Sequence, residues 1–124
     1  MPKNLNTRLI LLLLAGAALV MLVMALWFAE PIPPRNLTQG RMLGIESRVR
    51  AFYARTGTLP LSLAQLPEGP EGHDNSILDG WHRPIEYEVS EGTVKLRSLG
   101  QDGAIGGNGA ASDIVHEFRL DDAR

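Results

Sequence analysis

The chain opens with a long apolar run that carries no charge. Residues 9–29 are dominated by Leu, Ala, Val and Met. As a helix, at about 1.5 Å per residue, this run spans about 31 Å, which matches the ~30 Å hydrocarbon core of a bilayer. A cleaved signal peptide is the alternative, but Trp27 would stand at −3 if Ala29 stood at −1, where cleavage needs small residues. We therefore expect a retained transmembrane helix at 9–29.

The charges that flank this run predict how it lies in the membrane. Lys3 and Arg8 belong to residues 1–8, and the positive-inside rule places that segment on the cytoplasmic side. Trp27 and Phe28 suit the aromatic belt at the opposite interface. The single-pass chain then carries all of its remaining residues on the far side of the membrane.

A proline-rich segment, residues 30–36, follows the run and predicts a stiff linker, because proline removes backbone donors and restricts the residue before it. Apolar residues then recur every three or four positions and predict an amphipathic helix at 37–55. Asn36 is placed to cap this helix, with Gln39 in capping-box register, and Gly57 is placed to end it. The basic residues of the helix fall mostly on other faces, and we interpret them as solvated. The apolar stripe consists of Met42, Ile45, Val49, Phe52 and Tyr53.

Further along the chain the apolar period changes to two, which predicts β-strands. Alternation over 85–89 and 94–98, around a short turn, predicts a hairpin with one buried face. Alternation over 114–120 predicts a third strand. The predicted fold class is α+β: after the transmembrane helix comes one domain, residues 37–124, in which the amphipathic helix packs on a three-stranded antiparallel sheet.

The segment between the predicted helix and the first strand is polar and rich in turn formers, so we expect a surface loop at 68–76. Trp81 follows this loop, and we interpret it as a core residue. Asp79 is placed to brace the turn before Trp81.

Composition narrows the classes of partner. The chain has 12 basic and 14 acidic residues, and Lys3 and Arg8 precede the membrane run. The part beyond the run is left with ten basic residues and a net charge of −4, which argues against nucleic acid as a partner. Cysteine is absent, so disulfides and thiol chemistry are excluded. An exported domain of about 90 residues without disulfides has a marginal core, and a bound metal is one of the usual supplements.

One glycine-rich stretch, residues 98–114, has the composition of a cation-binding loop. It holds five glycines and two acids, Asp102 and Asp113. Glycine permits positive φ angles, which let a backbone turn its carbonyls inward, and carboxylates among carbonyls suit a hard cation such as Ca²⁺. Asn108 can add an amide oxygen. An irregular surface loop with incidental acids is the alternative that composition leaves open.

Other kinds of chemistry find little support in the sequence. The same stretch lacks the third glycine of a dinucleotide fingerprint and the lysine of a phosphate-binding loop. The three histidines share no zinc-ligand spacing. Catalysis would need a nucleophile with a base, or two aimed carboxylates, and a glycine-rich loop is too mobile to aim Asp102 and Asp113. We therefore expect a structural or interaction protein rather than an enzyme.

Three segments carry a resemblance to a known family. Residues 53–60 form a helix exit into a Leu-Pro step, residues 79–87 read Asp-Gly-Trp-His-Arg-Pro-Ile-Glu-Tyr, and residues 98–114 read Ser-Leu-Gly-Gln-Asp-Gly-Ala-Ile-Gly-Gly-Asn-Gly-Ala-Ala-Ser-Asp-Ile. These segments resemble the globular domain of the major pseudopilins of the bacterial type II secretion system, the last of them at nearly every fixed position. The resemblance implies a periplasmic pilin-like domain anchored in the inner membrane. It also implies one bound Ca²⁺, other pseudopilins or secretion components as partners, and assembly into a short filament.

The resemblance further indicates which atoms would hold the ion. Asp102 and Asp113 fall on the family's acidic positions, and the carbonyl of Leu99 resembles a family ligand. The amide of Asn108 is a further candidate. Several family members carry another acid at the position of Ala111 or Asn108, so the resemblance implies a weaker affinity here.

The N-terminal segment departs from the family pattern. Pseudopilins have a glycine cleavage point followed by Phe-Thr-Leu-x-Glu, whereas Gly16 is followed here by Ala-Ala-Leu-Val-Met, and the run at 9–29 holds no Glu. The prolines of 30–36 also interrupt what is one continuous helix in the family. We expect a permanently anchored relative without prepilin peptidase processing. The alternative function is a membrane-tethered periplasmic adaptor or sensor that reuses the fold without a secretion role.

Overall fold

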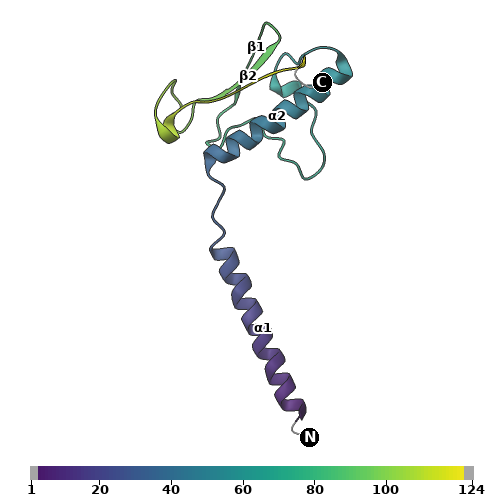
Figure 1. Cartoon of the computed structure of the whole chain (residues 1–124), viewed down its shortest axis with the longest axis vertical. Helices are drawn as coiled ribbons and strands as arrows, with labels where there is room; N and C mark the ends of the chain where they lie inside the picture. Colours follow the sequence, from purple (N-terminus) through teal and green to yellow (C-terminus); the bar gives the residue numbers. More distant parts are fainter. Residues whose placement is uncertain (1–2, 122–124) are drawn as a thin grey trace. The chain divides into compact units, whose positions relative to one another are not determined.

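The structure, a computed structural model, describes residues 3–121 and divides into two compact units (Figure 1). The first unit is Met1–Pro31, and it contains helix α1, Lys3–Trp27. The second unit, Ile32–Arg124, contains the other helices and the three strands that the structure describes. This division agrees with the composition, because the uncharged run ends where the prolines begin.

Beyond Arg8, helix α1 is uncharged and apolar around its whole circumference, and its large side chains are exposed. The stretch Asn4–Trp27 is long and apolar enough to cross a membrane. A helix of this kind has no polar face to present to water, which suits a lipid surrounding. The last helical turn ends near Trp27, where the N–H of Phe28 donates to the carbonyl of Met24 at 2.9 Å.

Helix α2, Pro34–Thr56, begins three residues before the predicted start. The expected cap is wrong: Pro33 occupies the N-cap position, Asn36 lies inside the first turn, and no capping-box bond forms there among the described residues. The physical reason is that Pro34 suits the first helical turn, since its φ is already fixed and its missing N–H would have no helical partner. The predicted end is confirmed, because Gly57 adopts φ 72° and its N–H donates to Tyr53.

The three predicted strands are confirmed as β1, Glu86–Ser90, β2, Thr93–Ser98, and β3, Ile114–Arg119. They form an antiparallel sheet in the order β1-β2-β3. The hairpin between β1 and β2 turns at Glu91 and Gly92, which both have positive φ angles, as the right-handed twist of a two-residue hairpin demands. The observed architecture is therefore α+β, as predicted.

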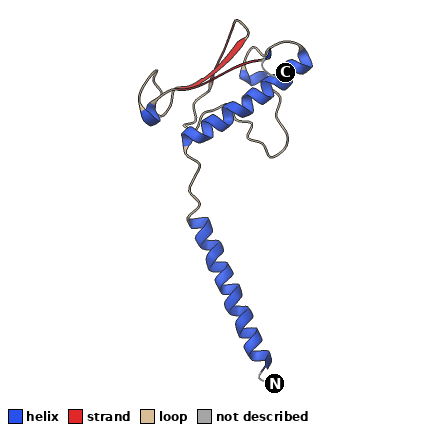
Figure 2. Cartoon of the chain, viewed as in Figure 1, coloured by secondary structure: helices blue, strands red, loops and turns tan. Residues whose placement is uncertain are grey.

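The core lies between α2 and one face of the sheet, with α2 packed mainly against β3 (Figure 2). Alternation along β2 buries Val94 and Leu96 completely. Val89 departs from the expected alternation and is 42% exposed, because it lies near the end of an edge strand. Trp81 packs against the core while remaining partly exposed. The buried apolar residues are Met42, Ile45, Val49, Leu63, Leu66, Ile85, Val94, Leu96, Ile114 and Phe118.

A polar cluster also joins α2 to β3. Glu46 on α2 accepts from Arg50 one turn later, and its other oxygen lies 2.5 Å from Nε2 of His116 on β3. The guanidinium of Arg50 stacks 5.2 Å from the centre of the Phe118 ring. Burial raises the pKa of Glu46, but the hydrogen bonds from His116 and Arg50 outweigh burial and hold the pKa below its ordinary value. His116 is thus a paired residue that helps to fix the helix on the sheet.

Candidate functional site: a glycine loop held by arginines

The glycine-rich loop connects β2 to β3 and lies at the end of the sheet near the start of α2 (Figure 1, yellow-green). Leu99 directly follows β2 and Asp113 directly precedes β3, and both are half-buried. Asp102 and Asn108 are exposed. The structure therefore distributes the four predicted metal ligands over the whole loop.

Each carboxylate already organises the backbone of the loop. Oδ1 of Asp102 accepts from the N–H of Ala104 at 3.1 Å. Oδ1 of Asp113 accepts from the N–H of Gly106 at 3.2 Å, which ties the end of the loop to its middle. The two acids thus support separate turns. Within residues 98–114, all of which the structure describes, neither carboxylate bonds to the turn that the other one supports.

The loop is folded so tightly that its own backbone leaves two of its glycines no room for a side chain. A Cβ on Gly107 would lie 2.5 Å from the carbonyl oxygen of Ala111, and one on Gly100 would lie 2.6 Å from that of Ser112. Both glycines also have positive φ angles. A short 3₁₀ turn, Gly109–Ala111, completes the return towards β3. Glycine is needed here because two stretches of backbone approach each other closely.

The donor set of the loop consists of oxygen atoms, which suits a hard cation. Two carboxylates and one amide are present, and the described residues contain no cluster of three or more Asp, Glu, His or Cys that could hold a metal alone. Ca²⁺ takes about six to eight oxygens, so most ligands would have to be backbone carbonyls and water. The residues present are compatible with Ca²⁺ in kind, but they supply little negative charge.

Arg83 fills one side of the loop. This residue precedes β1, and its Nη1 donates to the carbonyl of Gly100 at 2.6 Å while its Nη2 donates to Gln101 at 3.2 Å. The loop backbone lies directly on the guanidinium, because a Cβ on Gly103 would be 2.7 Å from the central carbon of Arg83. The first half of the loop is thus wrapped around a fixed positive charge.

Arg35 holds the second half of the loop from the first turn of α2. Its Nη1 donates to the carbonyls of Gly109, at 3.3 Å, and Ser112, at 3.2 Å. It also donates to Oγ of Ser112 at 3.1 Å. The start of the helix and the return of the loop therefore share one guanidinium.

A third arginine adds positive charge beside Asp113. Arg97 on β2 pairs with Glu86 on β1, with Nε 2.6 Å from the carboxylate oxygen. The hydrogen bond to Glu86 raises the pKa of Arg97, and the nearby charge of Asp113 acts in the same direction. Arg35 and Arg83 thus contact the backbone of the loop, and Arg97 adds a positive charge near Asp113.

The turn before β1, which carries Arg83, is built on a buried carboxylate. Asp79 is completely buried, and its Oδ1 accepts from the N–H groups of Trp81 and Arg83, both at 2.9 Å. Its Oδ2 accepts from Oγ of Ser98, the last residue of β2, at 2.8 Å. The expectation that Asp79 braces this turn is confirmed, and the carboxylate also fixes the turn to the sheet.

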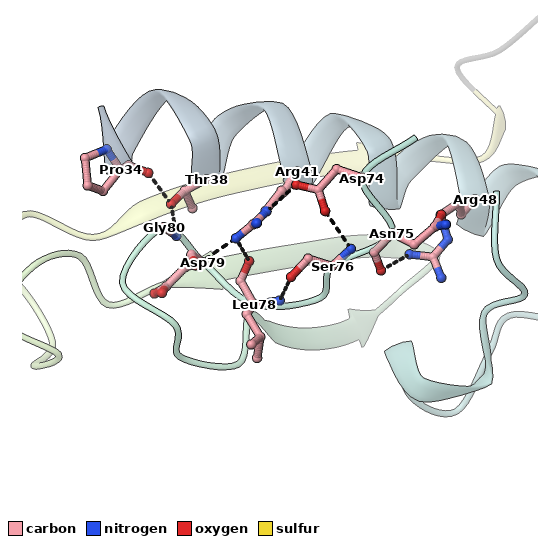
Figure 3. Close-up of polar contacts among 10 residues, drawn as sticks. All are labelled: Pro34, Thr38, Arg41, Arg48, Asp74, Asn75, Ser76, Leu78, Asp79 and Gly80. Atoms are coloured by element: carbon pink, nitrogen blue, oxygen red, sulfur yellow. Dashed lines mark hydrogen bonds and ion pairs between the residues drawn. The ribbon is translucent and has the colours of Figure 1, made fainter. Parts of the chain in front are cut away.

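Side chains of helix α2 fasten it to the backbone of the same turn (Figure 3). Oγ1 of Thr38 donates to the carbonyl of Pro34 at 2.7 Å and accepts from the N–H of Gly80 at 2.8 Å. Arg41 donates to the carbonyls of Leu78 and Asp79, both at 3.1 Å. The segment that presents Arg83 is therefore rigidly attached to the helix that presents Arg35.

The interpretation of the helix's basic residues as solvated is wrong for Arg41, Arg48 and Arg50, the last of which pairs with Glu46. Arg41 pairs with Asp74 at 2.7 Å, and this hydrogen bond, helped by one from the N–H of Ser76, lowers the pKa of Asp74. Arg48 donates to three carbonyls, those of Leu66, Pro67 and Asn75. The sequence signal for these contacts was the long irregular stretch after α2. Its backbone carbonyls need hydrogen-bond donors, and no neighbouring strand provides them.

Comparison with known proteins now decides the family. The family model described as "Type II secretion system (T2SS), protein G" matches residues 35–117. The chain belongs to the type II secretion system protein G family. This match begins at Arg35 in the first turn of α2 and ends within β3, so it covers the helix, the turn, the sheet and the glycine loop.

One relative of the chain is the type II secretion system core protein G of Xanthomonas campestris pv. campestris. The two are 29% identical over 119 residues, which cover 87% of this chain and 83% of the relative. No solved structure matches the chain significantly. The pseudopilin resemblance drawn from the sequence is thereby confirmed.

Proposed function

We propose that this pseudopilin-like chain is a non-enzymatic structural subunit that works in type II secretion from the inner membrane. The observation that carries the proposal is the family match over residues 35–117, which spans the folded unit from the first turn of α2 into β3. The membrane part of the proposal is supported by α1, in which Asn4–Trp27 is long and apolar enough to span a membrane. Arg8 near the start of α1 favours a cytoplasmic N-terminus and a periplasmic domain.

The proposed partners are other components of the secretion system, since the relative is named as a core protein of that system. Chemical cross-linking in intact cells, followed by purification of the full chain from detergent extracts, tests this. We expect cross-links to other secretion-system pseudopilins that disappear when the secretion genes are deleted. A chain that is never cross-linked to such components would contradict the proposal.

The same experiment addresses the adaptor alternative, which one structural observation favours. Helix α1 ends at Trp27 and α2 begins at Pro34, so the helix is interrupted at a place where we expect pseudopilins to be continuous. The intact mass of the purified chain adds a second readout. A chain that retains residues 1–16 and cross-links to no pseudopilin identifies an adaptor or sensor, whereas a chain that begins at Ala17 identifies a processed subunit.

We further propose that the glycine loop holds one Ca²⁺, with side-chain oxygens from Asp102 and Asp113 and additional oxygens from the Leu99 carbonyl and the Asn108 amide. The tight turns of the loop, its oxygen-only donors and its acids at both ends support this. When bound, the ion would supply positive charge that draws carbonyls and carboxylates together. The chain's own residues supply the frame, because Asp113 already connects the end of the loop to Gly106.

Thermal unfolding of the full chain in detergent micelles tests the calcium proposal. A ligand that binds only the folded state stabilises it by about 2.7 kcal/mol at a hundredfold excess over its Kd, so the melting temperature should rise with Ca²⁺ and fall with chelator. Asp102→Ala and Asp113→Ala should each abolish this difference. Asp121→Ala, an exposed acid outside the loop, is the matched control and should preserve it. Identical melting of the parent chain in Ca²⁺ and in chelator would remove the ion from the proposal.

A further inference from the structure

Two arginines hold the two halves of the glycine loop through its backbone oxygens. Arg83 donates to two consecutive carbonyls in the first half of the loop, and Arg35 donates to two carbonyls and a hydroxyl in the second half. Each group gathers backbone oxygens around one positive charge. This is physically the same task that a metal ion performs, but it is carried out by permanently charged side chains.

The charges of this region also balance without a metal. Residues 98–114 contain two acids and no basic residue, and Arg35 and Arg83 bring one positive charge each to that stretch. Arg97 lies close enough to Asp113 to interact with its charge. An incoming divalent cation would therefore meet an environment that is already neutralised, and it would be repelled by the guanidinium groups.

The arginines are rigidly held, so they can act as fixed charges rather than mobile surface groups. Arg83 follows a turn fixed by the buried Asp79, whose Oδ1 accepts the N–H of Arg83 itself. Arg35 lies in the first turn of α2, which Thr38 and Gly80 fasten to that same turn. Both guanidinium groups are therefore held on one framework, formed by α2 and the turn before β1.

We propose that Arg35 and Arg83 are positioning residues that act as built-in cations: they keep the glycine loop closed without Ca²⁺ and weaken its affinity for the ion. The first half of this proposal stands on the hydrogen bonds alone. The second half rests on the proposed calcium site. The two halves predict different measurements, so they can fail separately.

Hydrogen exchange of the full chain in detergent and chelator, read by mass spectrometry on peptides covering 99–113, tests loop closure. In the parent chain the N–H groups of Gln101, Ala111 and Ser112 are bonded within the loop and should exchange slowly. Arg83→Ala and Arg35→Ala should each speed that exchange at least tenfold, while Arg119→Ala, which removes only an exposed pair with Asp121, should leave it unchanged. Unchanged exchange in both loop variants would overturn the proposal that they close the loop.

Calorimetric titration with Ca²⁺ tests the effect of charge. Arg83→Gln keeps an N–H donor but removes the charge, so it should tighten Ca²⁺ binding about fivefold, as expected for a unit charge several ångströms away in a wet site. Arg83→Lys keeps the positive charge but cannot donate to both carbonyls in the way that a guanidinium does. It should therefore have the Ca²⁺ affinity of the parent chain. If Arg83 had only a structural role, Arg83→Gln would lower the melting temperature equally with and without Ca²⁺. If Arg83 acts as a built-in cation, Ca²⁺ should reduce the loss of melting temperature in this variant.

Each remaining outcome is decisive. Equal affinity in Arg83→Gln and the parent chain would overturn the electrostatic half of the proposal. If the parent chain shows no heat of binding and no melting shift, the calcium site itself is wrong, and with it the second half. The hydrogen-exchange result still decides the first half, because that arm contains no Ca²⁺.

Discussion

Asp79→Ala is expected to lower the free energy of unfolding of the domain by about 4 kcal/mol, the largest effect of any single side chain in the turn. Its carboxylate accepts from two backbone N–H groups and from the hydroxyl of Ser98, and it is completely buried. Removing it leaves three donors without an acceptor, each at a cost of about 1–3 kcal/mol, partly relieved by relaxation and water entry. Thermal and urea unfolding of the full chain in detergent, monitored by near-ultraviolet circular dichroism, measures the loss of unfolding free energy.

The matched control for this change is Asp79→Asn, which keeps a carbonyl oxygen for Trp81 and Arg83 but loses the charge. We expect it to cost less than half as much as the alanine variant, because charge-assisted bonds are roughly twice as strong as neutral ones. The glycine loop should also loosen in Asp79→Ala, since Arg83 would lose its fixed position. An alanine variant as stable as the parent chain would show that this carboxylate does not organise the turn.

Gly80→Ala is expected to destabilise the domain by about 3 kcal/mol through contact between two stretches of backbone. A Cβ at this position would lie 2.2 Å from the carbonyl oxygen of Pro34 and 2.6 Å from two further Pro34 atoms. A flexible side chain could move aside, but the backbone at the start of α2 cannot do so without breaking the bond from Gly80 to Thr38. Chemical unfolding of the variant measures the cost.

Gly44→Ala on the same helix provides the opposite case and serves as the control. Its Cβ would meet nothing within 4 Å, so only the helical preference of alanine over glycine changes, which favours the folded state by about 0.5–1 kcal/mol. Two substitutions of identical chemistry should therefore shift stability in opposite directions. If Gly80→Ala were neutral or stabilising, the close approach of Pro34 and Gly80 would be wrong.

The fold was largely accessible from the sequence, because its main signals are local. The stripe from Met42 to Val49 has the period of a helix, the positions around Val94 and Leu96 have the period of a strand, and both sets are buried as predicted. The start of α2 was misplaced because two signals competed. Asn36 fits a cap by composition, but Pro34 fits the first turn by its fixed backbone angle, and the second preference decides.

The site was only partly accessible, because its decisive contacts join distant segments. The glycine spacing and the two acids identified the loop, and Asp79 could be assigned to its turn because its partners are two and four residues away. Nothing local in Arg35 or Arg83 shows that they point at the loop. Their targets lie 17 to 77 residues further along the chain, and only the folded topology brings them together.

The arrangement around Arg35 also bears on the order in which the domain can form during synthesis. The first turn of α2 is made early, yet Gly80 lies 42 residues after its partner Thr38, and the Gly109 carbonyl lies 74 residues after Arg35. Contacts of such long sequence separation slow folding, because the chain must close large loops before they form. These contacts require residues as far along the chain as Gly109, so we expect the domain to complete its fold only after the glycine loop has been synthesised.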